Sequence, residues 1–282
     1  MADQTGKLFV VPTPLGNLGD ITMRAADVLR SCAHVVAEDT RRTIKLLSHL
    51  GTDASRLTRL DANAVQADLD RVARWLEAGH DVALVTDAGT PCISDPGVAV
   101  VRLAIARGVQ VESLPGPSAV TTAVAVSGLV EGPFYFAGFL PRGKGELAAA
   151  VAQLASRTEP VVLFEAPHRI ADALQAMAEA MPDRQVVIAR EMTKLHEEIL
   201  RGTLAEIASV QREWLGEITV VLGPWSRMEN EAPDDDAVDA RIDEELAKGT
   251  HTRTVAERVA AWSGRPKRDV YARVIERKGG RA

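Results

Sequence analysis

Short runs rich in β-branched residues alternate with helical patterns over the first 114 residues, and this alternation limits the possible folds more than any other feature. The strand-like runs cover residues 8–11, 34–37, 82–86 and 109–114. Helical patterns separate them at residues 23–30, 42–50 and 67–78. Strands separated by helices form βαβ units, which build a largely parallel sheet. We therefore predict a parallel-sheet α/β domain over residues 1–116.

The pattern changes beyond residue 114. Further strand candidates follow one another at shorter spacing, at residues 134–137, 161–164, 186–190, 198–202 and 217–222. This spacing predicts a second α/β domain with a mixed sheet over residues 117–227. The polar, acidic stretch 228–236 has the composition of a linker. Three short helical patterns follow, at residues 237–248, 254–262 and 268–277, and predict a small helical module over residues 237–282.

The charge of the chain is distributed unevenly. The net charge is −6, but residues 248–282 contain ten Lys or Arg against three acidic residues, whereas residues 229–245 contain nine acidic residues. The predicted C-terminal module is therefore basic on an otherwise acidic chain, and a basic patch is a site for a polyanion. Its candidate contacts are Arg265, Lys267 and Arg268.

Several classes of protein are disfavoured. The two cysteines, Cys32 and Cys92, lie sixty positions apart, and the six histidines have no metal-binding spacing, so neither a disulfide scaffold nor a metal site is expected. We see no leader peptide and no apolar run of membrane-spanning length, and we expect a cytoplasmic protein with no membrane partner.

The stretch TDAGTPCISDPG, residues 86–97, follows the third strand candidate and is dense in turn residues. Asp95 and Pro96 have the features of a helix N-cap and first-turn proline. The preceding Asp87 and its Gly-rich neighbours bring bare backbone amides and a carboxylate to the carboxyl edge of the sheet, where α/β proteins bind ligands. The alternative is a tight strand-to-helix loop with a solvated Asp87.

Two similar loops follow other strands. In LPGPSA, Ser118 is suited to cap a buried helix whose N-terminus can receive a polar ligand group, although any buried helix needs a cap. The loop VPTPLGNLGDIT contains neither a GxGxxG nor a GxxxxGK[ST] pattern. A nucleoside-sized ligand would therefore be held in another way.

The stretch AEDTRRTIKLL places Thr40 as a candidate N-cap and puts Arg41 and Arg42 in the first helical turn, where the helix dipole disfavours cations. Such a local conflict often marks a functional site. An arginine pair beside Glu38 and Asp39 suits phosphate contact, and a solvated pair is the alternative.

A fifth stretch, AREMTKLHEEILRGT, packs titratable groups between two strand candidates. Lys194, His196 and Glu197 are suited to acid–base work or phosphate binding. The alternative is an ordinary charged hairpin loop.

Taken together, TPLGNLGDIT, AEDTRRTIKLL, DAGTPCISDPG, LPGPSA, EAPHRI and REMTKLHEEILRGT resemble, in order, the motifs of the tetrapyrrole methylase superfamily and, within it, the ribosomal RNA small subunit methyltransferase I family. The family commonly begins with Gly-Thr-Pro where this chain has Val11, Pro12, Thr13 and Pro14. The resemblance implies a two-domain α/β fold with S-adenosylmethionine bound in the cleft between the domains.

The resemblance also implies an activity, partners and site residues. The activity is 2′-O-methylation of a cytidine ribose in small-subunit (16S) ribosomal RNA, free or in the assembled 30S subunit, by a homodimer without a metal. Cofactor contacts carried over by motif are Pro14, Leu15, Asp87, Ile93, Ser94, Asp95, Ser118, Ala119 and Phe164. Candidates for the group that takes the hydroxyl proton are Glu38, Asp39, Lys194, His196 and Glu197. RNA contacts are expected from Arg41, Arg42, Arg265, Lys267 and Arg268.

Two alternatives stay open at this point. A methyltransferase acting on a small corrin or porphyrin precursor would share the cleft but would have no use for a basic C-terminal module. A non-catalytic RNA- or ribosome-binding protein would keep the fold without the reaction.

Overall fold

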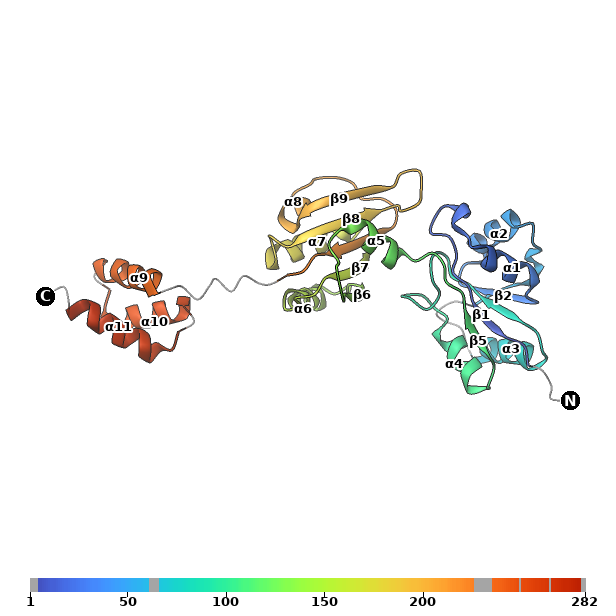
Figure 1. The fold of residues 1–282 in the computed structure, drawn as a ribbon, viewed down its shortest axis with the longest axis horizontal. Coiled ribbons are helices and arrows are strands. Elements are labelled where there is room, and N and C mark those ends of the chain that lie inside the picture. The colour runs from blue at the N-terminus through green and yellow to red at the C-terminus, as the bar shows by residue number, and fades with distance from the viewer. Residues whose placement is uncertain (1–4, 61–65, 226–234, 249, 264, 280–282) are drawn as a thin grey trace. The chain divides into compact units, whose positions relative to one another are not determined.

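The structure, a computed structural model, describes residues 5–60, 66–225, 235–248, 250–263 and 265–279. The chain divides into two compact units, Met1–Trp225 and Ser226–Ala282. Among these described residues, the first unit contains two five-stranded sheets and the second contains three helices (Figure 1).

The first sheet is entirely parallel, as predicted. Its strands in chain order are β1 (Leu8–Val10), β2 (His34–Ala37), β3 (Leu57–Arg59), β4 (Val82–Leu84) and β5 (Val111–Ser113). The spatial order is β3-β2-β4-β1-β5, so β1 pairs with both β4 and β5. The short strand β3, with one exposed and two half-buried residues, was not predicted because it lacks a clear apolar pattern.

Helices cover both faces of this sheet. They are α1 (Met23–Ser31), α2 (Thr40–His49), α3 (Gln66–Glu77) and α4 (Val98–Ala106), with short 3-10 turns at Leu18–Asp20 and Ala54–Arg56. Leu29 of α1 and Leu47 of α2 pack in one apolar cluster, whereas Leu76 of α3 and Val100 of α4 pack in another. The buried strands carry apolar residues on both faces for this reason.

The second sheet is mixed, also as predicted. Its strands are β6 (Tyr135–Phe139), β7 (Val161–Glu165), β8 (Gln185–Arg190), β9 (Glu198–Thr203) and β10 (Ile218–Leu222), in the spatial order β6-β7-β10-β8-β9. Strand β6 is parallel to β7, and β10 lies antiparallel between β7 and β8. Strand β10, the last of these strands along the chain, is thus central in the sheet and fully buried.

Helices also cover both faces of the second sheet. They are α5 (Ala119–Ser127), α6 (Lys144–Ala155), α7 (Ile170–Ala180) and α8 (Leu204–Ala208). Val120 of α5 packs on one face with Val162 and Val221. The other three helices pack on the opposite face, around Met177 and Leu163. The division at residues 116 and 117, which lie in the connection between β5 and α5, stays a prediction.

The C-terminal unit is a three-helix module of α9 (Asp235–Ala247), α10 (Thr252–Ser263) and α11 (Lys267–Gly279), each close to a predicted helix. Val238, Ile242, Val255, Val259 and Val274 are among the buried residues of its own small core. The predicted linker over residues 228–236 lies outside the described residues except for Asp235 and Asp236, which begin α9.

Candidate active site

The first unit contains a pocket of about 320 Å³ at the carboxyl edge of the first sheet, within the range typical of small-molecule sites. Residues that follow strands of the first sheet line one side: Leu15, Glu38, Arg42, Asp87, Ala88, Gly89, Thr90, Ile93, Ser94 and Asp95. Residues of α5 and the second sheet, with neighbouring loops, line the other: Ser118, Ala119, Val120, Phe139, Phe164, Met192, Glu217 and Thr219. The site thus needs both halves of the unit.

Three loops meet at this edge because β4, β1 and β5 are neighbours. Thr13 and Gly89 exchange backbone hydrogen bonds of 2.9 Å in both directions. The Thr90 hydroxyl donates to the Pro117 carbonyl at 3.0 Å. These bonds join the loops after all three strands, so the 87–97 loop is held in place from two sides.

The backbone of that loop is unusual. Gly89 has a φ of +83°, and a Cβ there would lie 3.3 Å from Leu15 Cδ2. Cys92 and Ser94 also have positive φ, at 70° and 63°, without being glycines. Such conformations cost of order 1 kcal/mol or more each and are typical of ligand-binding segments.

One expectation for this loop is wrong. The helix after it begins at Val98 with Gly97 at the N-cap position, and not with Asp95 as the cap and Pro96 in its first turn. The φ of +126° at Gly97 delays the helix by two residues. Asp95 therefore lines the pocket instead of capping the helix.

Ser118 stands at the N-cap of α5, as predicted, but its side chain makes no capping hydrogen bond. The first amides of a helix have no acceptor within the helix. Ser118, Ala119 and Val120 all line the pocket, so this end of α5 offers polar groups to a ligand there.

The lining is strongly acidic. Glu38, Asp87, Asp95 and Glu217 are opposed by one cation, Arg42. Burial raises the pKa of Asp95 above its ordinary value, and the carboxylates of Asp87 and Glu217 raise it further. A pocket with this excess of carboxylates suits a ligand that carries a positive charge.

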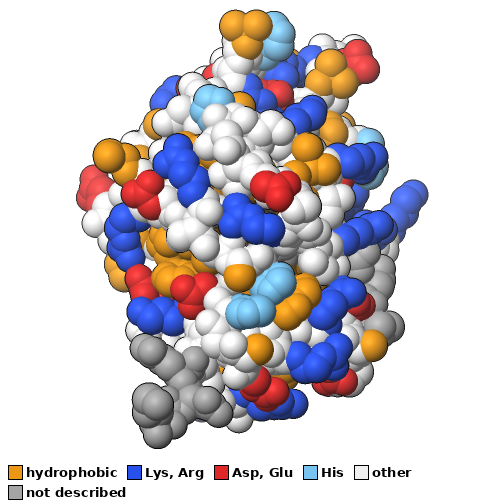
Figure 2. All heavy atoms as spheres, turned by 90° about the vertical axis from the view of Figure 1, so that its right-hand side faces the viewer, with side chains coloured by type: hydrophobic (Ala, Val, Ile, Leu, Met, Phe, Trp, Pro, Cys, Tyr) orange, Lys and Arg blue, Asp and Glu red, His pale blue; other side chains and the backbone are white. Residues whose placement is uncertain are grey.

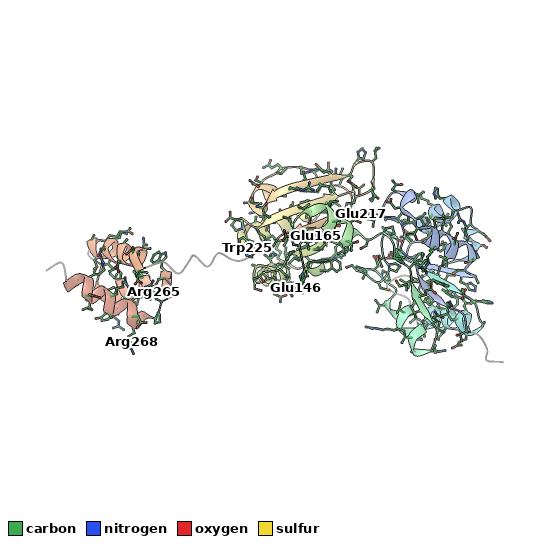
Figure 3. The ribbon with its side chains drawn as sticks, in the orientation of Figure 1. Glu146, Glu165, Glu217, Trp225, Arg265 and Arg268 are labelled. Atoms are coloured by element: carbon green, nitrogen blue, oxygen red, sulfur yellow. The ribbon has the colours of Figure 1, made fainter. Side chains whose placement is uncertain are left out.

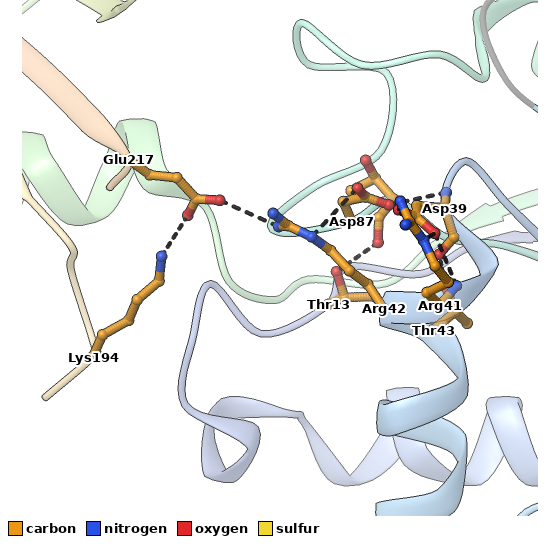
Figure 4. Close-up of polar contacts among 9 residues, drawn as sticks. Thr13, Asp39, Arg41, Arg42, Thr43, Asp87, Lys194 and Glu217 are labelled. Carbon is orange, nitrogen blue, oxygen red and sulfur yellow. Dashed lines mark hydrogen bonds and ion pairs between the residues drawn. The ribbon is translucent and has the colours of Figure 1, made fainter. Parts of the chain in front are cut away.

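Alternating positive and negative side chains connect the two halves of the unit through three residues that line the pocket, Glu217, Arg42 and Asp87 (Figure 4). Lys194 Nζ lies 2.7 Å from Glu191 Oε1 and 3.0 Å from Glu217 Oε2. The other oxygen of Glu217 lies 3.2 Å from Arg42 Nη1, and Arg42 Nε lies 3.6 Å from Asp87 Oδ2. Glu217 of the second half thus joins two cations, one of which belongs to α2 of the first.

These contacts keep the side chains of Lys194 and Arg42 protonated. Burial opposes the charged form of Lys194, but hydrogen bonds to Glu191 and Glu217 outweigh it and raise its pKa. Burial likewise opposes the charged form of Arg42, and Glu217 and Asp87 raise its pKa. Both side chains are cations at neutral pH.

Helix α2 begins differently from the expectation. Asp39, not Thr40, is its N-cap and accepts from the Arg41 amide at 2.9 Å. The same carboxylate binds the Arg41 guanidinium, whose hydrogen bonds lower the pKa of Asp39 to about 2. Arg41 and Arg42 do lie in the first turn, and an acidic partner for each explains how the helix tolerates them.

The structure brings most of the predicted cofactor contacts together. Eight line the pocket: Leu15, Asp87, Ile93, Ser94, Asp95, Ser118, Ala119 and Phe164. Pro14 lines a smaller neighbouring cavity of about 70 Å³, which shares Arg42 and Asp87 with the main pocket.

The predicted proton acceptors are more scattered. Glu38 lines the pocket. Asp39 and Lys194 lie next to lining residues, Lys194 through its contact with Glu217. Glu197 accepts from the Thr193 amide, and His196 is exposed on the same loop. Neither of these two lines the pocket.

Sequence reasoning missed several lining residues, among them Phe139, Met192, Glu217 and Thr219. Glu217 precedes a strand whose central place in the sheet follows from pairing and not from order in the chain. In the sequence, Glu217 is only a carboxylate at the start of an apolar strand. That feature is too common to predict a binding site.

The cations of the C-terminal module are largely paired. Arg265 lies 2.5 Å from Asp235, and Lys267 lies 2.6 Å from Glu257. Arg273 and Arg277 likewise pair with acidic residues of α9. Arg268 lies near the start of α11, where Figure 3 labels it, and forms no ion pair with any described residue. The acidic run and the basic run therefore compensate one another, and the module is less basic than the C-terminal segment alone suggests.

Comparisons with known proteins agree with this architecture. Residues 7–208 match the family of Tetrapyrrole (Corrin/Porphyrin) Methylases. A diphthine synthase of known structure matches with a TM-score of 0.62 at 18% identity, over 77% of this chain and 90% of its own. A cobalt precorrin-4 methyltransferase matches with a TM-score of 0.56 at 17% identity, over 77% and 94%. The fold and site thus define a methyltransferase of the tetrapyrrole methylase class.

Sequence relatives define the family more narrowly. A ribosomal RNA small subunit methyltransferase I of Bacillus subtilis (strain 168) is 37% identical over 275 residues, which are 94% of this chain and 93% of that protein. The protein of the same name from Micromonospora olivasterospora is 40% identical over 98% of this chain and 89% of its own. The chain belongs to the ribosomal RNA small subunit methyltransferase I family.

Methyltransferases of this family use S-adenosylmethionine. The pocket fits that cofactor on two counts: it is acidic where a sulfonium is cationic, and α5 presents its N-terminus without a capping side chain. None of the described helices is long and apolar enough to cross a bilayer.

Proposed function

We propose that this protein methylates the 2′-hydroxyl of a cytidine ribose in small-subunit ribosomal RNA, with S-adenosylmethionine as the donor. The observation that carries the proposal is the acidic pocket between the two sheets, in a chain whose near full-length relatives are named ribosomal RNA small subunit methyltransferase I. The expected partner is the ribosomal RNA or the assembled 30S subunit.

The donor supplies a methyl group on an already activated carbon, so the protein contributes mainly positioning. Backbone groups around Gly89, the end of α5 at Ser118 and the aromatic face of Phe164 would hold it. The carboxylates of Asp87 and Asp95 would balance its positive charge. We expect no metal ion to take part.

A ribose hydroxyl is a weak nucleophile at neutral pH, and a nearby carboxylate that accepts its proton helps the reaction. Among the five predicted candidates we favour Glu38, since it is the one that lines the pocket. The arginine pairing holds the Asp39 carboxylate at a low pKa, which makes it a weak base. Lys194 is protonated and suits charge balance better than proton abstraction.

A tetrapyrrole acceptor is the second candidate, because the family description names corrin and porphyrin methylases. Precursors of corrins and porphyrins carry many carboxylates and RNA carries many phosphates, so the acidic lining of the pocket does not separate these two acceptors. RNA fits the names of the relatives better.

Methyl transfer to purified 30S subunits, to naked 16S RNA and to a corrin precursor separates these proposals. We expect label from the methyl donor in ribosomal RNA, resistant to alkali at the modified nucleotide as a 2′-O-methyl group is. The label should be lost in Asp87→Ala, and Glu38→Gln should lower kcat by about 10²- to 10⁴-fold. Label in the corrin precursor alone would overturn the RNA assignment, and no label in any acceptor would favour the non-catalytic alternative.

We also propose that the protein acts as a homodimer in the cytoplasm, the compartment of its substrate. Light scattering in solution measures the mass, and a monomer under assay conditions would contradict the dimer without touching the proposed reaction.

A further inference from the structure

The motif EAPHRI forms a buried ion pair that the pocket does not use. The Glu165 side chain is fully buried. Figure 3 labels it in the part of the unit built on the second sheet. Its Oε1 lies 3.3 Å from Arg169 Nη1 and accepts from the Ala166 amide at 2.8 Å. A charged pair with so little solvent is costly to bury, so it needs compensating contacts.

Arg169 makes those contacts on a different segment. Its Nη2 donates to the carbonyls of Leu140 and Pro141, at 2.8 and 2.6 Å. The planar guanidinium can span a carboxylate and two successive carbonyls at once, which a lysine ammonium cannot do with the same rigidity. Arg169 therefore fixes the start of the loop between β6 and α6.

This loop, residues 140–143, and the first residue of α6 carry two exposed cations, Arg142 and Lys144. Neither forms an ion pair with any described residue. The nearest acidic side chain along the chain, Glu146, approaches the backbone of Gly143 instead. The cations beside the pocket differ, because Arg41, Arg42 and Lys194 all have carboxylate partners.

The loop begins at the rim of the pocket. Phe139, the last residue of β6, lines the pocket. Gly138 lies close to the opposite rim, since a Cβ there would be 3.3 Å from Ser94 Oγ. Arg142 and Lys144 thus lie three and five positions after a pocket-lining residue.

The end of the unit that carries the first sheet differs from this loop. There, Lys and Arg side chains are interspersed with Asp and Glu, as Figure 2 shows. A polyanion is attracted by cations that have no acidic partner, because a paired cation presents little net charge.

We propose that Arg142 and Lys144 contact the phosphate backbone of the RNA next to the methylated nucleotide, and that Arg169 is a positioning residue for them. The inference rests on the proposed RNA substrate. It adds the place on the protein where the RNA phosphate backbone binds. Phosphate contacts of this kind set affinity and register, whereas base contacts set the sequence preference.

The test measures binding of labelled oligocytidylate RNA to the full-length protein over a series of salt concentrations. In Arg142→Ala/Lys144→Ala, the Kd should rise about 10-fold, and the slope of log Kd against log salt should fall by about 0.7 for each lost contact. The KM for 30S subunits should rise in parallel, while kcat and the KM for S-adenosylmethionine stay unchanged.

Arg74→Ala/Arg102→Ala is the matched control, because these exposed cations of α3 and α4 also lack an ion pair with any described residue and do not line the pocket. It should bind RNA as the wild type does. Equal Kd and salt slope in the two double variants would overturn the proposal. Wild-type protein that binds the RNA through these residues but labels no ribosomal RNA would instead contradict the proposed function.

Arg169→Lys tests the positioning role, because it keeps a positive charge beside Glu165 and so avoids leaving that carboxylate alone. We expect a weaker RNA affinity with unchanged kcat, and no further loss when Arg169→Lys is added to Arg142→Ala/Lys144→Ala. Additive losses in the combined variant would show that Arg169 does not act through the two cations.

Discussion

The side chain of Lys194 crosses the Cα atom of Gly16, so that a Cβ at residue 16 would fall 2.3 Å from Lys194 Cγ. Lys194 belongs to the loop between β8 and β9 of the second sheet, and Gly16 to the loop after β1 of the first. The neighbouring Asn17 amide donates to the Thr193 hydroxyl at 3.2 Å. These contacts hold the two rims of the pocket together at one end.

Gly16→Ala should therefore destabilise the unit and weaken cofactor binding. Overpacking of this kind costs about 1–3 kcal/mol, which for a unit of this size lowers the midpoint of thermal unfolding by roughly 2–10 °C. Calorimetric unfolding and titration with S-adenosylmethionine measure the two effects. Gly132→Ala is the control, because a Cβ there meets nothing within 4 Å. Equal effects of the two substitutions would show that the contact with Lys194 is unimportant.

Glu217→Gln should lower activity. The substitution keeps the shape but removes the charge that Arg42 and Lys194 share, and two partly exposed pairs contribute about 0.5–2 kcal/mol together. We expect kcat/KM to fall by about 2- to 30-fold.

Glu112→Gln is the matched control for that change, because Glu112 joins Lys7 and Arg24 in the same way and does not line the pocket. Its kcat/KM should equal that of the wild type. A similar loss in both variants would assign the effect to general charge and not to the pocket.

Affinity for the methyl donor should depend on pH through Asp95. Because the pKa of Asp95 is raised, its carboxylate takes up a proton at a higher pH than an ordinary aspartate. As the pH falls, the pocket loses this negative charge, so binding of the cationic S-adenosylmethionine should weaken more than binding of the neutral S-adenosylhomocysteine. Calorimetric titration of both compounds between about pH 4 and pH 8 measures the ratio. The ratio should become less dependent on pH in Asp95→Asn, and an unchanged dependence would assign it to another group.

The strands and helices of this fold are predictable from the sequence where each of them has a clear pattern of apolar residues that become buried. Strands β1, β2 and β4 and helices α1 to α3 fall within a few residues of their predicted positions. Helices α6 and α7 were not predicted, although α7 buries Ile170, Leu174 and Met177. Their alanine-rich sequences blur the boundary between a buried and an exposed face.

The site was predictable where one loop carries its residues, as the 87–97 loop does. It was not predictable where pairing of strands in space brings residues together, as for Glu217, or where a charge is cancelled by a distant segment. Arg265 is the clearest case, because its partner Asp235 lies thirty positions earlier in what reads as an acidic linker. Charge counted along the chain misses such compensation.

Removal of everything after Trp225 should weaken RNA binding more than cofactor binding. The pocket lies wholly within the first unit, so the Kd for S-adenosylmethionine should stay within about twofold of the full-length value. The module adds cations such as Arg268, and its loss should raise the Kd for 30S subunits by about 3- to 10-fold at low salt. Unchanged RNA affinity in the truncated protein, or an equal loss of cofactor affinity, would contradict a role for the module in RNA capture.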